Sequence, residues 1–141
     1  MLASRLRLAV LGFALVCAAS PALADSFTYK AVLKGSRETP PNDSKATGSV
    51  EAKYDKATLK LSWTVTYSGL SGPVTAAHFH GPAKPGDTAG PVITLEAPFD
   101  SPIKGEATLT PAQAADVAAD LWYLNLHTAK FPQGEIRGQL K

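Results

Sequence analysis

The chain has 141 residues, 45% of them hydrophobic and 18% charged, and its formal net charge is +2 at pH 7. Charges of both signs are scattered along it, so the sequence offers no basic patch for nucleic acid or anionic lipid, and we expect neither partner. A chain of this length predicts a single folded domain.

The N-terminal segment is typical of a secretory signal peptide. Two arginines lie among the first seven residues, an apolar run covers residues 8–19, and Ala22 and Ala24 form the small-residue pattern of a signal-peptidase site. The apolar run is shorter than the ~20 residues of a permanent membrane helix, although an uncleaved anchor is the alternative. We therefore expect cleavage after Ala24.

Cleavage would remove residues 1–24 and leave residues 25–141 as the mature domain. Cys17, the only cysteine, lies in the removed segment, so the mature domain would contain no disulfide. A domain of this size can bury an adequate core without one. We expect a periplasmic or secreted monomer that is free of the membrane, and the short signal with no cysteine framework favours a bacterial periplasm.

The first half of the mature domain predicts three β-strands, over residues 27–33, 48–54 and 58–67. Residues 36–48 form a loop, since the Pro-Pro-Asn-Asp run within them is incompatible with a strand. The third strand shows the clearest period of two, which marks a strand with one buried face. The residues of that face are Leu59, Leu61, Trp63, Val65 and Tyr67.

The second half predicts five more strands and one helix. The strands cover residues 75–80, 92–95, 105–109, 122–127 and 135–140. Ala-rich residues 112–120 form the helix, in which Thr110 is the N-cap, Pro111 the first helical residue and Gln113 the partner in a capping box. The sequence therefore predicts an all-β protein: an antiparallel Greek-key or immunoglobulin-like β-sandwich with one short connecting helix.

Alternation places all three histidines on the outer face of the sheet. His78 and His80 share one face of their strand, and Phe79 between them takes the core face. In the strand over residues 122–127, three apolar side chains take the core face, so His127 also points outward. If the two strands are neighbours, the three imidazoles converge.

Three converging imidazoles are a ligand set for Cu(II) or Zn(II). We expect a single copper or zinc ion held by His78, His80 and His127, with an open coordination position and no organic cofactor. The residues expected around the ion, as partners of the ligands or of bound water, are Tyr123, Asn125, Asp87 and Arg137. The alternative is that the histidines are ordinary surface residues, or that they pin the loop over residues 81–91.

Other chemistry is weakly supported by the sequence. The mature domain has no cysteine nucleophile, and no serine lies in a G-x-S-x-G turn. Glu106 and Glu135 are isolated on strands, and we expect Glu135 and Arg137, which share a face, to pair across strands rather than to act in catalysis. Trp63 and Trp122 are predicted in the core.

Two long motifs resemble those of the chordin-type (CHRD) domain. They are "AAHFHGPAKPGDTAGPVITL" and "LWYLNLHTAKFPQGEIRGQL", and the resemblance covers essentially the whole mature domain. It implies an extracellular or periplasmic β-sandwich, a domain found in animal chordins, which antagonise growth factors, and in exported bacterial proteins. It implies no reaction, so the function has to be argued from the site.

A weaker similarity is to the copper–zinc superoxide dismutases, which are Greek-key barrels with a His-x-His pair and a late histidine. His78 and His80 would match the pair, His127 the late histidine, and Arg137 the arginine that guides anions. No histidine lies between His80 and His127 to bridge two metals, and the disulfide is missing, so a binuclear centre is excluded.

Three functions follow. The first is an exported CHRD-type binding domain that holds one copper or zinc ion through three histidines. The second is a mononuclear copper enzyme acting on superoxide or a similar oxidant, although we lean against an enzyme. The third is a metal-free module that presents the loops over residues 37–47 and 81–91 to a protein or a polysaccharide.

Overall fold

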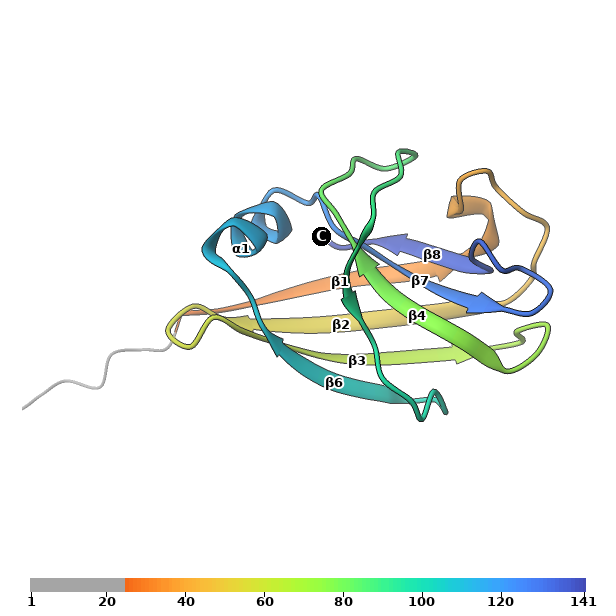
Figure 1. Cartoon of the computed structure of the whole chain (residues 1–141), viewed down its shortest axis with the longest axis horizontal. Coiled ribbons are helices and arrows are strands. Elements are labelled where there is room, and N and C mark those ends of the chain that lie inside the picture. The colour runs from red at the N-terminus through yellow and green to blue at the C-terminus, as the bar shows by residue number, and fades with distance from the viewer. Residues whose placement is uncertain (1–24) are drawn as a thin grey trace, which may run out of the picture.

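A computed structural model describes residues 25–141, which form eight β-strands, one 3₁₀-helix and one α-helix (Figure 1). The predicted signal peptide and Cys17 lie outside the described residues. The elements in chain order are β1 (Ser26–Lys34), η1 (Gly35–Arg37), β2 (Thr47–Asp55), β3 (Lys60–Ser68), β4 (Val74–His80), β5 (Pro91–Thr94), β6 (Ile103–Thr108), α1 (Pro111–Ala118), β7 (Tyr123–Thr128) and β8 (Ile136–Gln139). The predicted strands are all present, with ends that differ by at most two residues.

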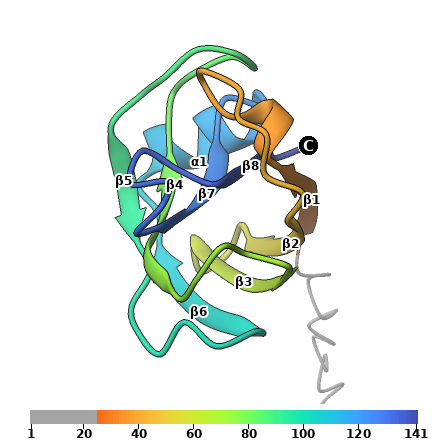
Figure 2. The same ribbon diagram turned by 90° about the vertical axis from the view of Figure 1, so that its right-hand side faces the viewer.

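The eight strands form one antiparallel sheet in the order β5-β4-β7-β8-β1-β2-β3-β6. Seen end-on, the sheet curves round on itself, so that β4 and β7 lie across from β2 and β3 (Figure 2). The Trp63 ring of β3 meets the Phe79 ring of β4 with their centroids 5.2 Å apart. The prediction of an all-β antiparallel fold with one short helix is confirmed.

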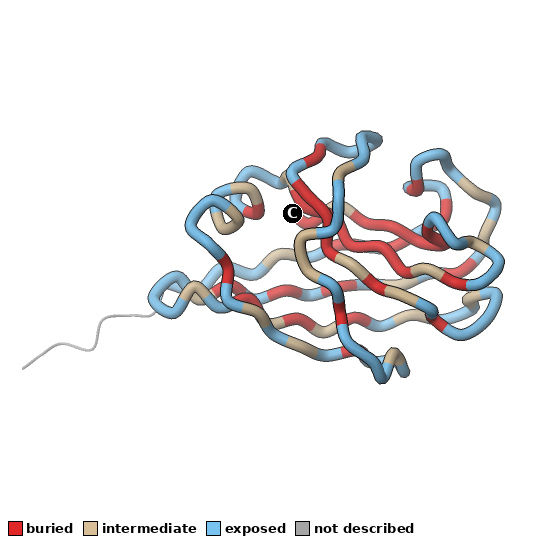
Figure 3. The backbone as a smooth tube through the Cα atoms, in the orientation of Figure 1, coloured by how far each residue is buried: buried red, intermediate tan, exposed pale blue. Residues whose placement is uncertain are grey.

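The strands β2 and β3 follow the predicted alternation of buried and exposed residues, and β1 shows the same alternation from Tyr29 onward (Figure 3). Trp63 and Trp122 are buried in the core, as predicted. Leu59, predicted as the first core position of β3, lies in the preceding turn with a φ of 59°, and from there it packs, partly buried, against the core. The reason is Asp55, whose carboxylate accepts hydrogen bonds from the backbone N–H groups of Ala57 and Thr58 and so prolongs the turn.

The helix begins as its sequence predicts. The Thr110 hydroxyl accepts a hydrogen bond from the Gln113 backbone N–H at 3.2 Å, and the Gln113 side chain accepts one from the Thr110 N–H at 2.9 Å. It ends at Ala118, two residues earlier than predicted, and Asp120 has a φ of 58°. No helix among residues 25–141 is long and apolar enough to cross a membrane.

Strands β7 and β8 are buried on both faces, unlike the half-exposed strands of the other layer (Figure 3). Two long loops, over residues 35–46 and 81–90, lie at the same end of the molecule and join through the Thr39 hydroxyl, which donates to the Gly86 carbonyl at 3.2 Å (Figure 2). The outer face of β7 and β8 is therefore a polar layer that the loops largely cover, with His127 at its partly exposed edge.

Candidate metal centre

The three histidines form one cluster because β4 and β7 are hydrogen-bonded neighbours. In their antiparallel register, His78 lies opposite Asn125, and Ala76 lies opposite His127. The Nδ1 atom of His78 is 3.1 Å from Nε2 of His127. One ring nitrogen from each of the three histidines lies within 4.8 Å of the others. The predicted convergence of the imidazoles is confirmed.

Backbone carbonyls fix the tautomers of two of these rings. Nδ1 of His80 donates to the Ala89 carbonyl at 2.9 Å, and Nδ1 of His127 donates to the Pro132 carbonyl at 2.9 Å. A neutral imidazole carries one proton, so Nε2 of both rings keeps a free lone pair. This is the arrangement in which a histidine ligates a metal through Nε2 while its other nitrogen is held by a carbonyl.

The freed lone pairs point at a third acceptor. Nε2 of His80 and Nε2 of His127 each lie 3.0 Å from the Asn125 Oδ1 atom. Neither nitrogen has a proton to donate once its Nδ1 is committed to a carbonyl, so three acceptor atoms face one another. Such an arrangement is stabilised by a cation among the acceptors, by a proton on Nδ1 of His78 that is donated to Nε2 of His127, or by rotation of the Asn125 amide so that its NH₂ donates to both rings.

A proton is a poor candidate for that cation. Desolvation by burial lowers the pKa of His80, which is only 8% exposed, and its hydrogen bonds to Ala89 and Asn125 oppose this only in part. Burial and the neighbouring His127 and His80 rings also lower the pKa of His78. His78 and His80 are therefore neutral at pH 7, the state in which histidine binds a metal.

Of the four residues expected around the ion, three lie in the layer with the histidines. Asn125 touches two of the rings, and Tyr123 stacks on His80 with a ring separation of 4.7 Å and an angle of 1° between the planes. The Arg137 guanidinium covers the Tyr123 ring at 3.5 Å. The His80 ring thus belongs to a stack, which fixes its orientation. No hydrogen bond or ion pair within residues 25–141 joins the Asp87 carboxylate to a histidine; its charge acts on Arg137.

Glu38 is a buried residue of this layer that sequence reasoning missed. It is 7% exposed, and burial raises its pKa to about 7 against the opposing influence of Arg137 and Asn125. The loop after β7 closes against it at Gly134, which has a φ of 126°. A Cβ there would collide with the Glu38 carboxylate and would lie 2.7 Å from the Asn125 amide nitrogen. Glu38 lies in the Pro-rich loop predicted over residues 36–48, and nothing in that sequence indicated that the side chain would be buried.

The predicted pairing of Glu135 with Arg137 is wrong. Glu135 is 1% exposed and accepts hydrogen bonds from Ser44 at 2.8 Å, from the Ser71 hydroxyl at 2.7 Å and from Thr128 at 2.6 Å. Burial acts to raise its pKa, and these hydrogen bonds outweigh burial, so the pKa is lowered. The carboxylate joins the loops of Ser44 and Ser71 to the end of β7 at Thr128, rather than an arginine, because the loops bring hydroxyl groups to it that the strand pattern does not reveal.

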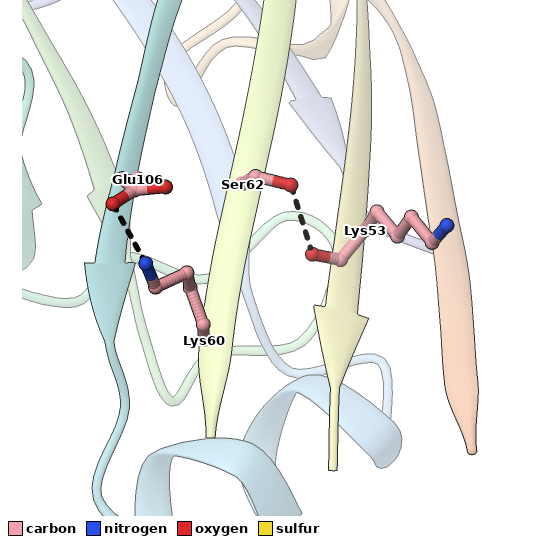
Figure 4. A network of polar contacts seen from close by, with 4 residues as sticks. All are labelled: Lys53, Lys60, Ser62 and Glu106. Carbon is pink, nitrogen blue, oxygen red and sulfur yellow. Dashed lines mark hydrogen bonds and ion pairs between the residues drawn. The ribbon is translucent and has the colours of Figure 1, made fainter. Parts of the chain in front are cut away.

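Glu106 is also less isolated than predicted. Its carboxylate accepts a hydrogen bond from Lys60 across β6 and β3 at 2.8 Å, as an exposed ion pair on the opposite layer (Figure 4). Exposed pairs of this kind contribute little to stability. The same view shows Lys53 on the neighbouring strand, with its side chain directed away from this pair. Neither Glu106 nor Lys60 is near the histidines.

Comparison with known proteins identifies the family. The CHRD domain matches residues 29–140, which span every strand from within β1 to the end of β8. The chain belongs to the CHRD domain family. The resemblance seen in the two long motifs is thereby confirmed, and both motifs lie in the layer that carries the histidines. No curated protein and no solved structure matches the chain.

Proposed function

We propose that this CHRD domain binds one copper or zinc ion through His78, His80 and His127. The observation that carries the proposal is the pair of tautomers held by the Ala89 and Pro132 carbonyls, which leave two Nε2 lone pairs facing the same point. An ordinary surface histidine does not need a hydrogen bond from Nδ1 to a backbone carbonyl. Histidines that bind a metal almost always have a hydrogen bond of this kind on their other ring nitrogen.

The donor set favours copper or zinc over harder ions. Three imidazoles without a carboxylate or thiolate suit Cu(II) and Zn(II), whereas Mg²⁺ and Ca²⁺ prefer oxygen ligands. Three protein ligands also leave a position for water or for an exchangeable ligand. His78 and His127 are only partly buried, so an ion has access from the solvent side, while His80 and its stack with Tyr123 form the inner wall.

The test is a metal titration of residues 25–141 without a histidine tag. Cu(II) and Zn(II) should each bind at one ion per chain, measured by calorimetry or by competition with a chelator. His127→Ala removes a ligand and should weaken binding by at least about tenfold. The loss of a residue that only supports a metal ligand already weakens binding by about this factor. His78→Ala and His80→Ala should behave in the same way.

Glu106→Gln is the matched control, because it removes an exposed carboxylate from the opposite layer (Figure 4). Its affinity should equal that of the unmodified domain. If His127→Ala binds Cu(II) and Zn(II) as tightly as the unmodified domain, the three-histidine site is wrong. The histidines would then serve only to pin the two loops that their Nδ1 atoms contact.

The proposal extends to where the domain acts and to its chemistry. We propose export to the periplasm or outside the cell after removal of residues 1–24, which mass spectrometry of the protein from its host would test. Redox chemistry on superoxide stays a prediction from the sequence. Dismutation no faster than that of free copper would exclude it.

A further inference from the structure

The buried Asn125 side chain lies among the three histidines. It is 4% exposed, and in the register of β4 and β7 it lies opposite His78. Its Oδ1 atom is 3.0 Å from Nε2 of His80 and 3.0 Å from Nε2 of His127. A buried acceptor without a partner costs free energy, so this oxygen requires a donor or a cation at the point where the rings meet.

The histidines do not supply that donor. Nδ1 of His80 and Nδ1 of His127 donate to backbone carbonyls, and a neutral imidazole carries only one proton. A proton on Nδ1 of His78 is directed at Nε2 of His127, 3.1 Å away, and not at Asn125. Such a proton satisfies His127 and still leaves Oδ1 of Asn125 facing Nε2 of His80 as two acceptors.

The other end of the Asn125 amide opposes its rotation. Nδ2 of Asn125 and Oε1 of Glu38 both lie against Gly134, where an added Cβ would collide with each of them. Burial raises the pKa of Glu38, and a hydrogen bond from Asn125 is among the contacts that oppose this rise. Exchange of Oδ1 and Nδ2 would lose that hydrogen bond and set two oxygens against each other. Glu38 therefore keeps Oδ1 directed at the histidines.

When the His78 proton lies on Nε2, four acceptor atoms converge: Nδ1 of His78, Nε2 of His80, Nε2 of His127 and Oδ1 of Asn125. The first lies 3.1 Å from Nε2 of His127, and the Asn125 oxygen lies 3.0 Å from both Nε2 atoms. Metal–ligand distances of about 2.0–2.1 Å place neighbouring ligands of a four-coordinate ion roughly 2.9–3.4 Å apart, from planar to tetrahedral geometry. The three separations fall in this range.

We propose that Oδ1 of Asn125 is a fourth ligand of the metal ion and that Glu38 is the positioning residue that directs it. This inference rests on the proposed function, since it concerns the same three-histidine site. The asparagine oxygen occupies the position that three histidines leave open. Four protein ligands are typical of sites that hold a metal, whereas sites that activate water keep one position free. The inference therefore favours a metal-holding domain over a redox enzyme.

The first test compares zinc affinities at pH 8, where the imidazoles are neutral. Asn125→Leu removes the ligand at similar size and should weaken binding by at least about tenfold. Asn125→Asp, which keeps an oxygen towards the rings, should bind zinc more tightly than Asn125→Leu. Gln139→Leu is the matched control, because it removes an amide of β8 whose hydrogen bonds go to the Ala83 and Asp120 carbonyls. Its affinity should equal that of the unmodified domain.

The positioning role of Glu38 has its own pair of variants. Glu38→Leu removes the acceptor that holds Nδ2 of Asn125, so the amide can rotate and donate to the rings, and zinc binding should weaken. Glu38→Gln offers a side-chain oxygen at the same place and should restore the affinity. Equal zinc affinity of Glu38→Leu and the unmodified domain would overturn the positioning role.

A spectroscopic measurement on the unmodified domain avoids any folding defect of the variants. Residues 25–141 contain two asparagines, Asn42 and Asn125, so labelling asparagine with ¹³C at the side-chain carbonyl gives one probe in the site and one reference. Asn42 donates to the Gly134 and Glu135 carbonyls and touches no histidine. With Cu(II) bound, pulsed electron paramagnetic resonance should detect a ¹³C coupling to copper, and the same labelling of Asn125→Asp should abolish it.

The two ways in which this inference can fail are distinct. If the unmodified domain binds one copper ion without a ¹³C coupling, or if Asn125→Leu binds zinc as tightly as the unmodified domain, Asn125 is not a ligand and the three-histidine site still stands. If the unmodified domain binds neither ion, the proposed function is wrong and the fourth ligand is excluded with it.

Discussion

Glu38 should make the stability of this domain fall as the pH rises from about 4.5 to 7. Burial raises the pKa of this carboxyl from 4.5 to about 7 in the folded protein, so between these values the folded state holds a proton that the unfolded state has lost. The free energy of unfolding therefore decreases as the pH rises through this range. A change of this size corresponds to roughly 3 kcal/mol.

Glu38→Gln replaces the ionising carboxyl by a neutral amide of the same shape. Other groups also titrate in this range, so the quantity to measure is the difference in unfolding free energy between the variant and the unmodified domain, by urea denaturation at pH 4.5 and at pH 8. The variant should gain roughly 2–3 kcal/mol relative to the unmodified domain between these two pH values. Glu106→Gln, which alters an exposed carboxyl, should show a much smaller change.

This reasoning is wrong if Glu38→Gln and the unmodified domain differ in unfolding free energy by the same amount at both pH values. It would mean that water or the facing Arg137 guanidinium compensates the buried charge, and that Glu38 ionises as an ordinary carboxyl. A direct titration of the Glu38 side chain by NMR would then give a midpoint near 4.5 rather than near 7.

Three other predictions follow from the site and the elements around it. Gly81→Ala should destabilise the domain by about 1–3 kcal/mol in urea denaturation, because the added Cβ would lie 2.8 Å from the buried Trp122 indole nitrogen; an unchanged midpoint would show that the ring can move. Thr110→Ala should cost about 1 kcal/mol by losing the cap to Gln113, and Thr110→Ser should restore it; no loss would mean that the helix does not depend on its cap. Zinc at a hundredfold excess over its Kd should add about 2.7 kcal/mol to the unfolding free energy at pH 7, and this gain should be lost in acid, where protons compete for His78; because burial lowers the pKa of His78, the loss should occur at a lower pH than for an ordinary imidazole, and a gain that persists until the domain unfolds in acid would argue against imidazole ligands.

Local patterns in the sequence determined most of the secondary structure. A period of two is a local property of a strand, so the core faces of β1, β2 and β3 and the outward face of His78 and His80 follow from the residue order alone. The capping box at Thr110 is equally local, since its hydrogen bonds span only three residues. The family could be predicted from two motifs, because they are too long for the resemblance to arise by chance.

The tertiary structure decided which strands are neighbours and what covers them. Only the pairing of β4 with β7 brings His127 to His78, across a gap in sequence that no local pattern bridges. Only the packing of two loops buries Glu38 and Arg137, because a loop's direction depends on what it meets rather than on its own residues. The sequence by itself established an all-β domain with three outward histidines. The fold turned that outward face into a polar layer that the loops largely cover.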